Sequence, residues 1–132
     1  MTLPPPGQTA RQWPDPREVV PQIGQRATTL FSFAIVSGRP RGAGAERYRH
    51  ILEASGELLD AAEVTEAEQV LIDWGRLLGT DASAVDSPLR VGLETRFSAP
   101  LRVALLQFAC ELVAADLYFT ARDADFPMGD AQ

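Results

Sequence analysis

Hydrophobic residues recur at helical spacing, three or four positions apart, in four segments of the chain. The segments cover residues 15–38, 45–62 and 65–79, and the stretch from residue 98 toward the C-terminus. This spacing places apolar side chains on one face of each helix, where they can pack into a shared core. The pattern therefore predicts an all-α fold, a small bundle of about four helices with the C-terminal helix at its centre.

Capping signals mark where several of these helices begin and end. Asp15-Pro16-Arg17-Glu18 combines an N-cap residue, a proline at the first helical position and an acid three residues after the cap. Pro21 falls inside the helical pattern and is expected to kink or restart the helix. Thr65-Glu66-Ala67-Glu68 has the form of a capping box, whereas Gly38 and Gly79 are expected to end helices.

Two segments, residues 28–36 and 89–97, are ambiguous between helix and strand. The first is rich in β-branched and aromatic residues, but helical spacing continues through it, and we favour a helix. In the second, apolar and polar residues alternate, although Ser87-Pro88 could start a helix; we favour an extended segment or a short irregular helix. The main alternative fold is therefore α+β, with these segments paired in a small sheet that a dimer would extend.

Composition divides the chain into three parts. Residues 1–14 are rich in proline and are expected to form an N-terminal tail, in which Trp13 docks on the core of the protein. Residues 15–124 are expected to form a single helical domain, since their length suits one core. Residues 125–132 are expected to be an acidic C-terminal tail.

Charge is distributed unevenly along the chain. The net charge is −6, which disfavours non-specific binding to nucleic acid or to anionic membranes. Residues 1–50 nevertheless contain seven Arg against three acids, whereas residues 51–132 contain five Arg against fifteen acids. This asymmetry predicts either a polarised surface or two halves that neutralise each other in the fold.

Residue usage indicates a source and a compartment. All 12 basic residues are arginine, there is no asparagine, and alanine is abundant, as expected for a GC-rich bacterial genome such as that of an actinobacterium. A single cysteine, Cys110, fits a reducing compartment. The N-terminus lacks the features of a signal peptide, and the most apolar span, residues 101–119, contains four polar or charged residues, which argues against a membrane helix. We therefore expect a cytoplasmic protein.

The C-terminal helix is the most informative element, with Ser98 expected to cap it. It is apolar on almost every side, so it either lies at the centre of the bundle or faces a second subunit. The residues expected to face the core are Leu101, Leu105, Phe108, Ala109, Leu112 and Phe119. A further set, Val103, Leu106, Cys110, Val113 and Leu117, extends the apolar surface around the helix.

Asp116 lies inside this apolar surface and therefore needs a partner or a raised pKa. We favour a structural role, in which the carboxylate pairs with Arg90 or Arg96 or bonds Thr120 one turn later. One alternative places it at the rim of the core. Another makes it the acid of a pocket, acting as a general acid/base or binding a cationic ligand.

Two other clusters carry weaker site hypotheses. Glu46, His50 and Glu53 share a helical stripe and could bind a metal ion, although a solvated face is favoured and no cofactor is expected. Arg39, Arg41, Arg47 and Arg49 lie in and after a glycine-rich loop that could contact an anion, a nucleic acid or an acidic protein. A flexible surface loop is favoured there, since the loop lacks a nucleotide-binding motif.

These observations favour a non-enzymatic interaction protein that associates with itself or with another protein as an accessory or regulatory subunit. The first alternative is a nucleic-acid-associated regulator that uses the Arg39–Arg49 loop, and the second is a binding or catalytic pocket around Asp116. Nucleic acid is not the favoured partner, and no membrane association is expected.

Overall fold

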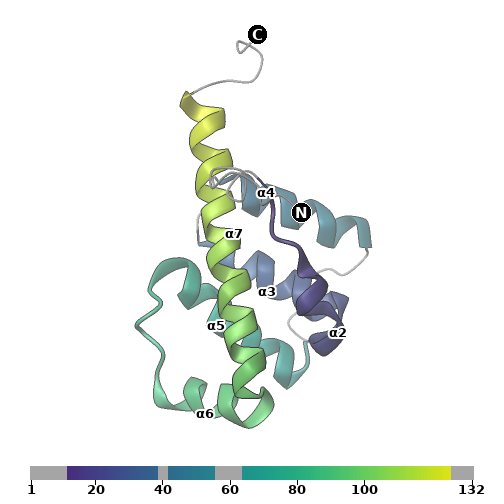
Figure 1. Ribbon diagram of the computed structural model, residues 1–132, viewed down its shortest axis with the longest axis vertical. Helices are drawn as coiled ribbons and strands as arrows, with labels where there is room; N and C mark the ends of the chain where they lie inside the picture. Colours follow the sequence, from purple (N-terminus) through teal and green to yellow (C-terminus); the bar gives the residue numbers. More distant parts are fainter. Residues whose placement is uncertain (1–11, 39–41, 56–63, 126–132) are drawn as a thin grey trace, which may run out of the picture.

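The computed structural model describes residues 12–38, 42–55 and 64–125, and this part of the chain is all-α (Figure 1). It contains six α-helices and one short 3-10 helix, with no strand in the described ranges. The elements are η1 (Pro16–Glu18), α2 (Val20–Ile23), α3 (Gln25–Ser37), α4 (Ala43–Ser55), α5 (Glu66–Thr80), α6 (Ser87–Arg96) and α7 (Ala99–Asp125). The predicted fold class is confirmed, whereas the expected number of about four helices was too low.

Both ambiguous segments are helical, so the alternative α+β fold is wrong. Residues 28–36 lie within α3, and residues 89–96 lie within α6. The Asp86 carboxylate caps α6 by accepting from Leu89 N at 2.9 Å, one residue before the expected cap. Leu93 and Phe97 are buried one turn apart, whereas Val91 is 60% exposed. The alternation of apolar and polar residues therefore wrongly suggested an extended segment, because Val91, one of the apolar residues, is exposed to solvent.

The N-terminal helical region is broken at two places. Asp15 caps η1 by accepting from Arg17 N at 3.0 Å, as predicted, and Pro21 lies in the first turn of α2, where the helix restarts. A second break, which was not predicted, falls at Gly24, whose φ of 94° requires a glycine. α3 follows and ends at Gly38, as predicted.

Helix α3 packs closely on α5 because two glycines of α5 face it. A Cβ atom at Gly75 would lie 3.0 Å from the Phe31 carbonyl oxygen, and one at Gly79 would lie 1.9 Å from the Ile35 carbonyl oxygen. The expected helix end at Gly79 is wrong, since α5 continues to Thr80. Gly79 instead allows the two backbones to approach each other.

The predicted capping box at the start of α5 is confirmed. Thr65 Oγ1 accepts from Glu68 N at 3.1 Å, and Glu68 Oε1 accepts from Thr65 N at 3.0 Å. The second oxygen of Glu68 accepts from Arg26 Nε at 2.9 Å. The same glutamate therefore closes the cap and ties the start of α5 to α3.

We expect Thr65→Ala to lower the free energy of unfolding by about 1 kcal/mol, because the amide of Glu68 loses its acceptor. Urea denaturation followed by circular dichroism measures this change. Thr95→Ala, at an exposed position within α6, is the matched control and should leave the midpoint nearly unchanged. Equal midpoints for the two variants would contradict a stabilising capping box.

Helix α4 begins at Ala43, two residues earlier than expected, and is described as far as Ser55. The rest of the predicted helix lies outside the described residues.

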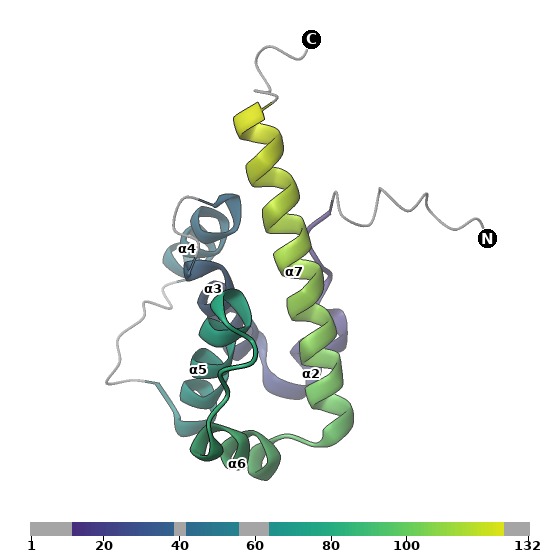
Figure 2. The ribbon, with the colours of Figure 1, turned by 90° about the vertical axis from the view of Figure 1, so that its left-hand side faces the viewer.

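Helix α7 is the longest element and packs against α3, α4 and α5. Figures 1 and 2 show that the C-terminal turns of α7 extend beyond the other helices. This arrangement covers one side of α7 and leaves the opposite side open.

Candidate functional site

One face of α7 forms part of the hydrophobic core. Leu105 and Leu112 are fully buried, Ala109 is 2% exposed, and Asp116 lies on the same side. Leu101 and Phe108 are also buried, as predicted. This core-facing side accounts for only part of the apolar surface of the helix.

A second apolar face lies on the opposite side of α7 and is open to solvent. We define the outer face of α7 as Val103, Leu106, Cys110, Val113 and Leu117, which follow one another at intervals of three, four, three and four residues. Val103 is 55% exposed, Leu106 43% and Leu117 56%. Cys110 is exposed, whereas Val113 is half-buried and packs against the core at the edge of this face. The intervals match the seam positions of a coiled coil, which pack against a second helix.

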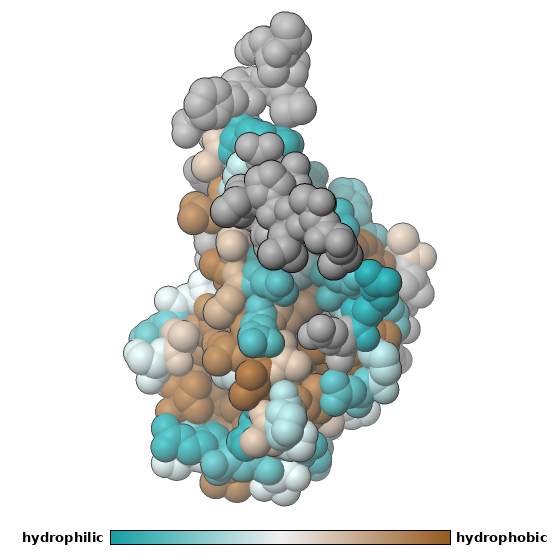
Figure 3. Space-filling view, in the orientation of Figure 1, coloured by the Kyte–Doolittle hydropathy of each residue, from teal (hydrophilic) through white to brown (hydrophobic). Residues whose placement is uncertain are grey.

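The figures show that other helices cover α7 on one side only. Helix α7 is seen along its whole described length in Figure 2, with no other helix in front of it. In the space-filling view of Figure 3, hydrophobic side chains follow the line of α7, with polar side chains between them. A straight helix could therefore approach α7 from this side.

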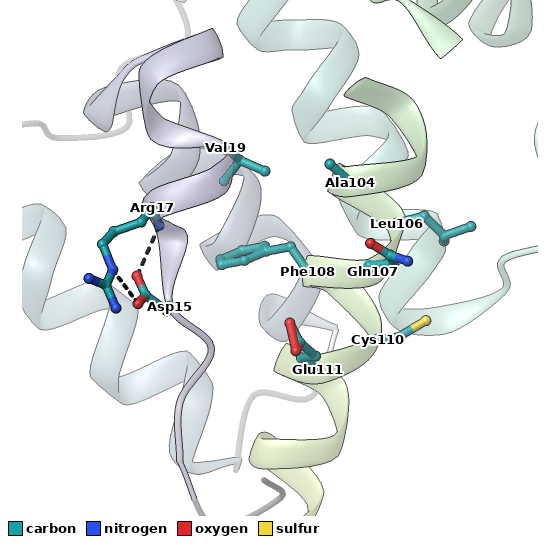
Figure 4. A pocket seen from close by; sticks show the side chains of 9 residues that line it. All are labelled: Asp15, Arg17, Val19, Ala104, Leu106, Gln107, Phe108, Cys110 and Glu111. Atoms are coloured by element: carbon teal, nitrogen blue, oxygen red, sulfur yellow. Dashed lines mark hydrogen bonds and ion pairs between the residues drawn. The ribbon is translucent and has the colours of Figure 1, made fainter. Parts of the chain in front are cut away.

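A groove of about 870 Å³ adjoins the outer face, between the segment that precedes α2 and the first half of α7 (Figure 4). Figure 4 shows Phe108 pointing toward Val19, whereas Leu106 and Cys110 point away from that segment. The polar lining residues are Asp15, Arg17, Gln107 and Glu111. Arg17 donates to Asp15 through its backbone N–H and its side chain, which lowers the pKa of the Asp15 carboxyl.

The groove was not predicted from the sequence. Its two walls are separated by about 90 residues of chain, and neither wall carries a recognisable binding motif. Its charged side chains are Asp15, Arg17 and Glu111, and the first two pair with each other. This lining is typical of a surface depression where two elements meet.

Asp116 is completely buried and caps a neighbouring helix. Its Oδ1 atom accepts from Gly44 N at 2.7 Å and lies 3.5 Å from Thr120 Oγ1. Thr120 Oγ1 in turn accepts from Ala43 N at 2.9 Å. Two side chains of α7 therefore bind the first amide groups of α4, which need acceptors from outside that helix.

Thr120 was one of the partners expected for Asp116, and its hydroxyl group contacts the Asp116 carboxylate in the structure. Of the two arginines proposed for it, Arg96 pairs with Glu66, and Arg90 is exposed on α6. Asp116 is absent from the lining of the groove. Its geometry therefore supports the structural role over the pocket acid.

The possible metal residues remain on the surface. His50 lies 3.8 Å from Glu46 and 3.8 Å from Glu53, and all three side chains are more than half exposed. Within the described ranges, no group of three or more histidine, cysteine or acidic side chains has an arrangement that could hold a metal ion. The three residues form a solvated stripe on α4.

The arginine cluster is only partly described. Arg39 and Arg41 lie outside the described residues, whereas Arg47 and Arg49 are exposed on α4. The Arg47 guanidinium lies 5.1 Å from the centre of the Trp13 ring. Its contact with Trp13 is a cation–π interaction.

Trp13 docks on the core, as predicted. Its ring stacks on Phe119 with centroids 5.0 Å apart and meets Tyr48 edge-on at 6.0 Å. Burial raises the pKa of the Tyr48 phenol, and the nearby Arg47 opposes this shift. The segment before α2 is thereby fixed across α4 and α7.

Helix α7 is also long and apolar enough, by length and composition, to cross a membrane over Ala99–Ala124. The polar residues of α7 were expected to argue against a membrane helix, but its length and composition do not support that expectation. Core helices of soluble proteins can be equally long and apolar, and 33% of the most apolar stretch of α7 is buried in the fold.

The fold and the outer face define a small all-α protein with an exposed apolar helix surface. Comparison with protein-family models, with curated proteins and with solved structures gave no match.

Proposed function

We propose that this protein is a non-enzymatic interaction protein that self-associates through the outer face of α7. The observation that carries the proposal is the line of three exposed side chains, Val103, Leu106 and Leu117, on the side of α7 away from the core. Aligned apolar side chains of this kind typically mark an interaction surface. The proposal also places the protein in the cytoplasm, as a subunit without a cofactor.

Energetics supports a helical partner for this face. Complete burial of a leucine or valine side chain contributes roughly 1.5–3 kcal/mol relative to full exposure. The outer face offers three such side chains that are about half exposed, together with Cys110 and Val113. The intervals of three and four residues keep all five on one seam over about 21 Å of helix. A second copy of α7 supplies a matching seam.

Light scattering after size exclusion tests the proposal with two matched variants. We expect the wild-type chain to dimerise with increasing concentration, and Leu117→Glu to remain monomeric because it places a charge in the seam. Val91→Glu on α6 is the control, since Val91 is 60% exposed and Leu117 is 56% exposed. That variant should dimerise like the wild type.

Two results would contradict the proposal. The first is a wild-type monomer at every concentration. The second is wild-type protein that floats with phospholipid vesicles while Leu117→Glu does not, which would assign the outer face to a membrane. The proposal expects the wild type to stay in the soluble fraction in that experiment.

A further inference from the structure

We infer that residues 12–18 form a latch that opens from α4 and α7 while the helices stay folded, and that Trp13 holds it closed. Opening the latch uncovers an aromatic surface that is otherwise blocked. The inference goes beyond the proposed function, because Leu106 and Cys110 of the outer face point away from this segment (Figure 4). A failure of self-association would therefore leave the inference intact.

The side chain of Trp13 attaches the latch at its N-terminal end. Its ring stacks on Phe119 with centroids 5.0 Å apart and meets Tyr48 edge-on at 6.0 Å. The Arg47 guanidinium lies 5.1 Å from the centre of the same ring. Each aromatic pair and the cation–π contact stabilises the closed latch, so the loss of one side chain removes all of these contacts together.

The backbone of the latch is not bonded to the helices that it crosses. Within the described ranges, no backbone–backbone hydrogen bond joins residues 12–18 to α4 or α7. Pro14 and Pro16 have no amide hydrogen to donate. Arg17 pairs with Asp15, two residues away in the same segment, and their side chains are 88% and 51% exposed. This pair can therefore move with the latch without breaking.

Open space borders the latch. The groove of about 870 Å³ lies beside Asp15 and Arg17, and a hollow of about 420 Å³ lies beside Trp13, between α4 and the C-terminal half of α7. Val19 is 1% exposed and marks the point where the chain enters the core. A segment with few buried contacts opens at a lower free-energy cost than the whole fold, so we place the hinge of the latch immediately before Val19.

The aromatic rings of Tyr48 and Phe119 lose their cover when Trp13 leaves. The Arg47 guanidinium lies 5.7 Å from the centre of the Tyr48 ring, and the Arg122 guanidinium lies 5.0 Å from the centre of the Phe119 ring. Aromatic residues and arginine are enriched at protein interfaces. In the closed state Trp13 occupies this surface, so a partner can bind there only after the latch opens. The latch is therefore an autoinhibitory contact.

Limited proteolysis of the full chain by trypsin tests the latch, because Arg17 lies within it. At low protease concentration the cleavage rate follows the population of the open form. We expect Trp13→Ala to be cleaved after Arg17 about tenfold faster than the wild type, since the open form loses its competitor. Trp13→Phe keeps an aromatic ring and should be cleaved at a rate closer to that of the wild type. Mass spectrometry identifies the fragment that begins at Glu18.

Cleavage after Arg76, within α5, reports unfolding of the helices in the same sample. Trp13→Ala should leave this rate nearly unchanged. Gly79→Ala is the matched control, because its added Cβ would press on the backbone of α3 and not on the latch. That variant should be cleaved after Arg76 roughly 100-fold faster than the wild type and after Arg17 at nearly the wild-type rate.

A fluorescent hydrophobic dye tests whether the latch covers an apolar surface. The comparison is between chains with and without Trp13→Ala, and both carry Leu117→Glu to reduce dye binding at the outer face. The chain with Trp13→Ala should bind more dye, because Tyr48 is 8% exposed when the latch is closed and becomes accessible when it opens.

Faster cleavage after Arg17 alone, together with stronger dye binding, supports the inference. Equal acceleration after Arg17 and Arg76 in Trp13→Ala would overturn it, because Trp13 would then stabilise the whole fold. An unchanged rate after Arg17 would show that Trp13 does not hold the segment closed. Unchanged dye binding would show that the segment covers no apolar surface. Either of these results also overturns the inference.

Discussion

Gly79→Ala is expected to lower the free energy of unfolding by about 3 kcal/mol. The added Cβ would lie 1.9 Å from the Ile35 carbonyl oxygen and 2.9 Å from the carbonyl carbon. These are backbone atoms of α3, so no side-chain rotation relieves the contact, and the two helices must separate. The separation disturbs the packing of α3 on α5, where Gly75 also lies close to the Phe31 carbonyl oxygen.

Gly92→Ala is the matched control, because it also adds a methyl group to a glycine within a helix. Its Cβ would lie 3.2 Å from Val70 Cγ2, the end of a side chain that can adjust. Alanine also improves helix propensity by up to about 1 kcal/mol at either position. We expect Gly92→Ala to be neutral or slightly stabilising in urea denaturation. Equal stability of the two variants would contradict the close approach of α3 and α5.

Asp116→Ala is expected to lower the free energy of unfolding by about 2–3 kcal/mol, because the buried Gly44 amide loses its acceptor. Asp116→Asn keeps an oxygen that can accept this bond and should lose less. Urea denaturation measures both changes. Hydrogen exchange adds a local test, since the Gly44 amide should exchange faster in Asp116→Ala than in the wild type.

Asp123→Ala provides the comparison on the same helix, since the Asp123 side chain is 53% exposed. That variant should unfold at nearly the wild-type urea concentration. If Asp116→Ala matched Asp123→Ala in both stability and exchange, the carboxylate of Asp116 would have no capping role.

Local signals in the sequence predicted the secondary structure where each signal acts over a few residues. The capping box at Thr65 and the cap at Asp15 are both present. Their hydrogen bonds join residues two or three positions apart, so the sequence contains every participant. The segment 89–97 was misjudged because its alternating pattern competed with the helix start at Pro88, and the cap at Asp86 was missed.

The core-facing side of α7 was also predictable, since helical spacing alone aligns Leu105 with Leu112. The same spacing showed that Asp116 would be buried among apolar residues. It could not identify Gly44 as a partner, because that contact joins positions 72 residues apart. The sequence could not predict that the outer face is exposed either. Helical periodicity identifies two apolar faces on α7, but it does not show which of them other helices cover.

The sequence by itself thus determined the all-α class, several helix starts and the apolar character of α7. Only the tertiary structure decided that Gly79 serves helix packing, that Asp116 caps α4, and that Val103, Leu106 and Leu117 remain exposed. The physical reason is the range of the interactions. Caps and helical periodicity act within a few residues, whereas burial and close backbone approach depend on where distant segments come together.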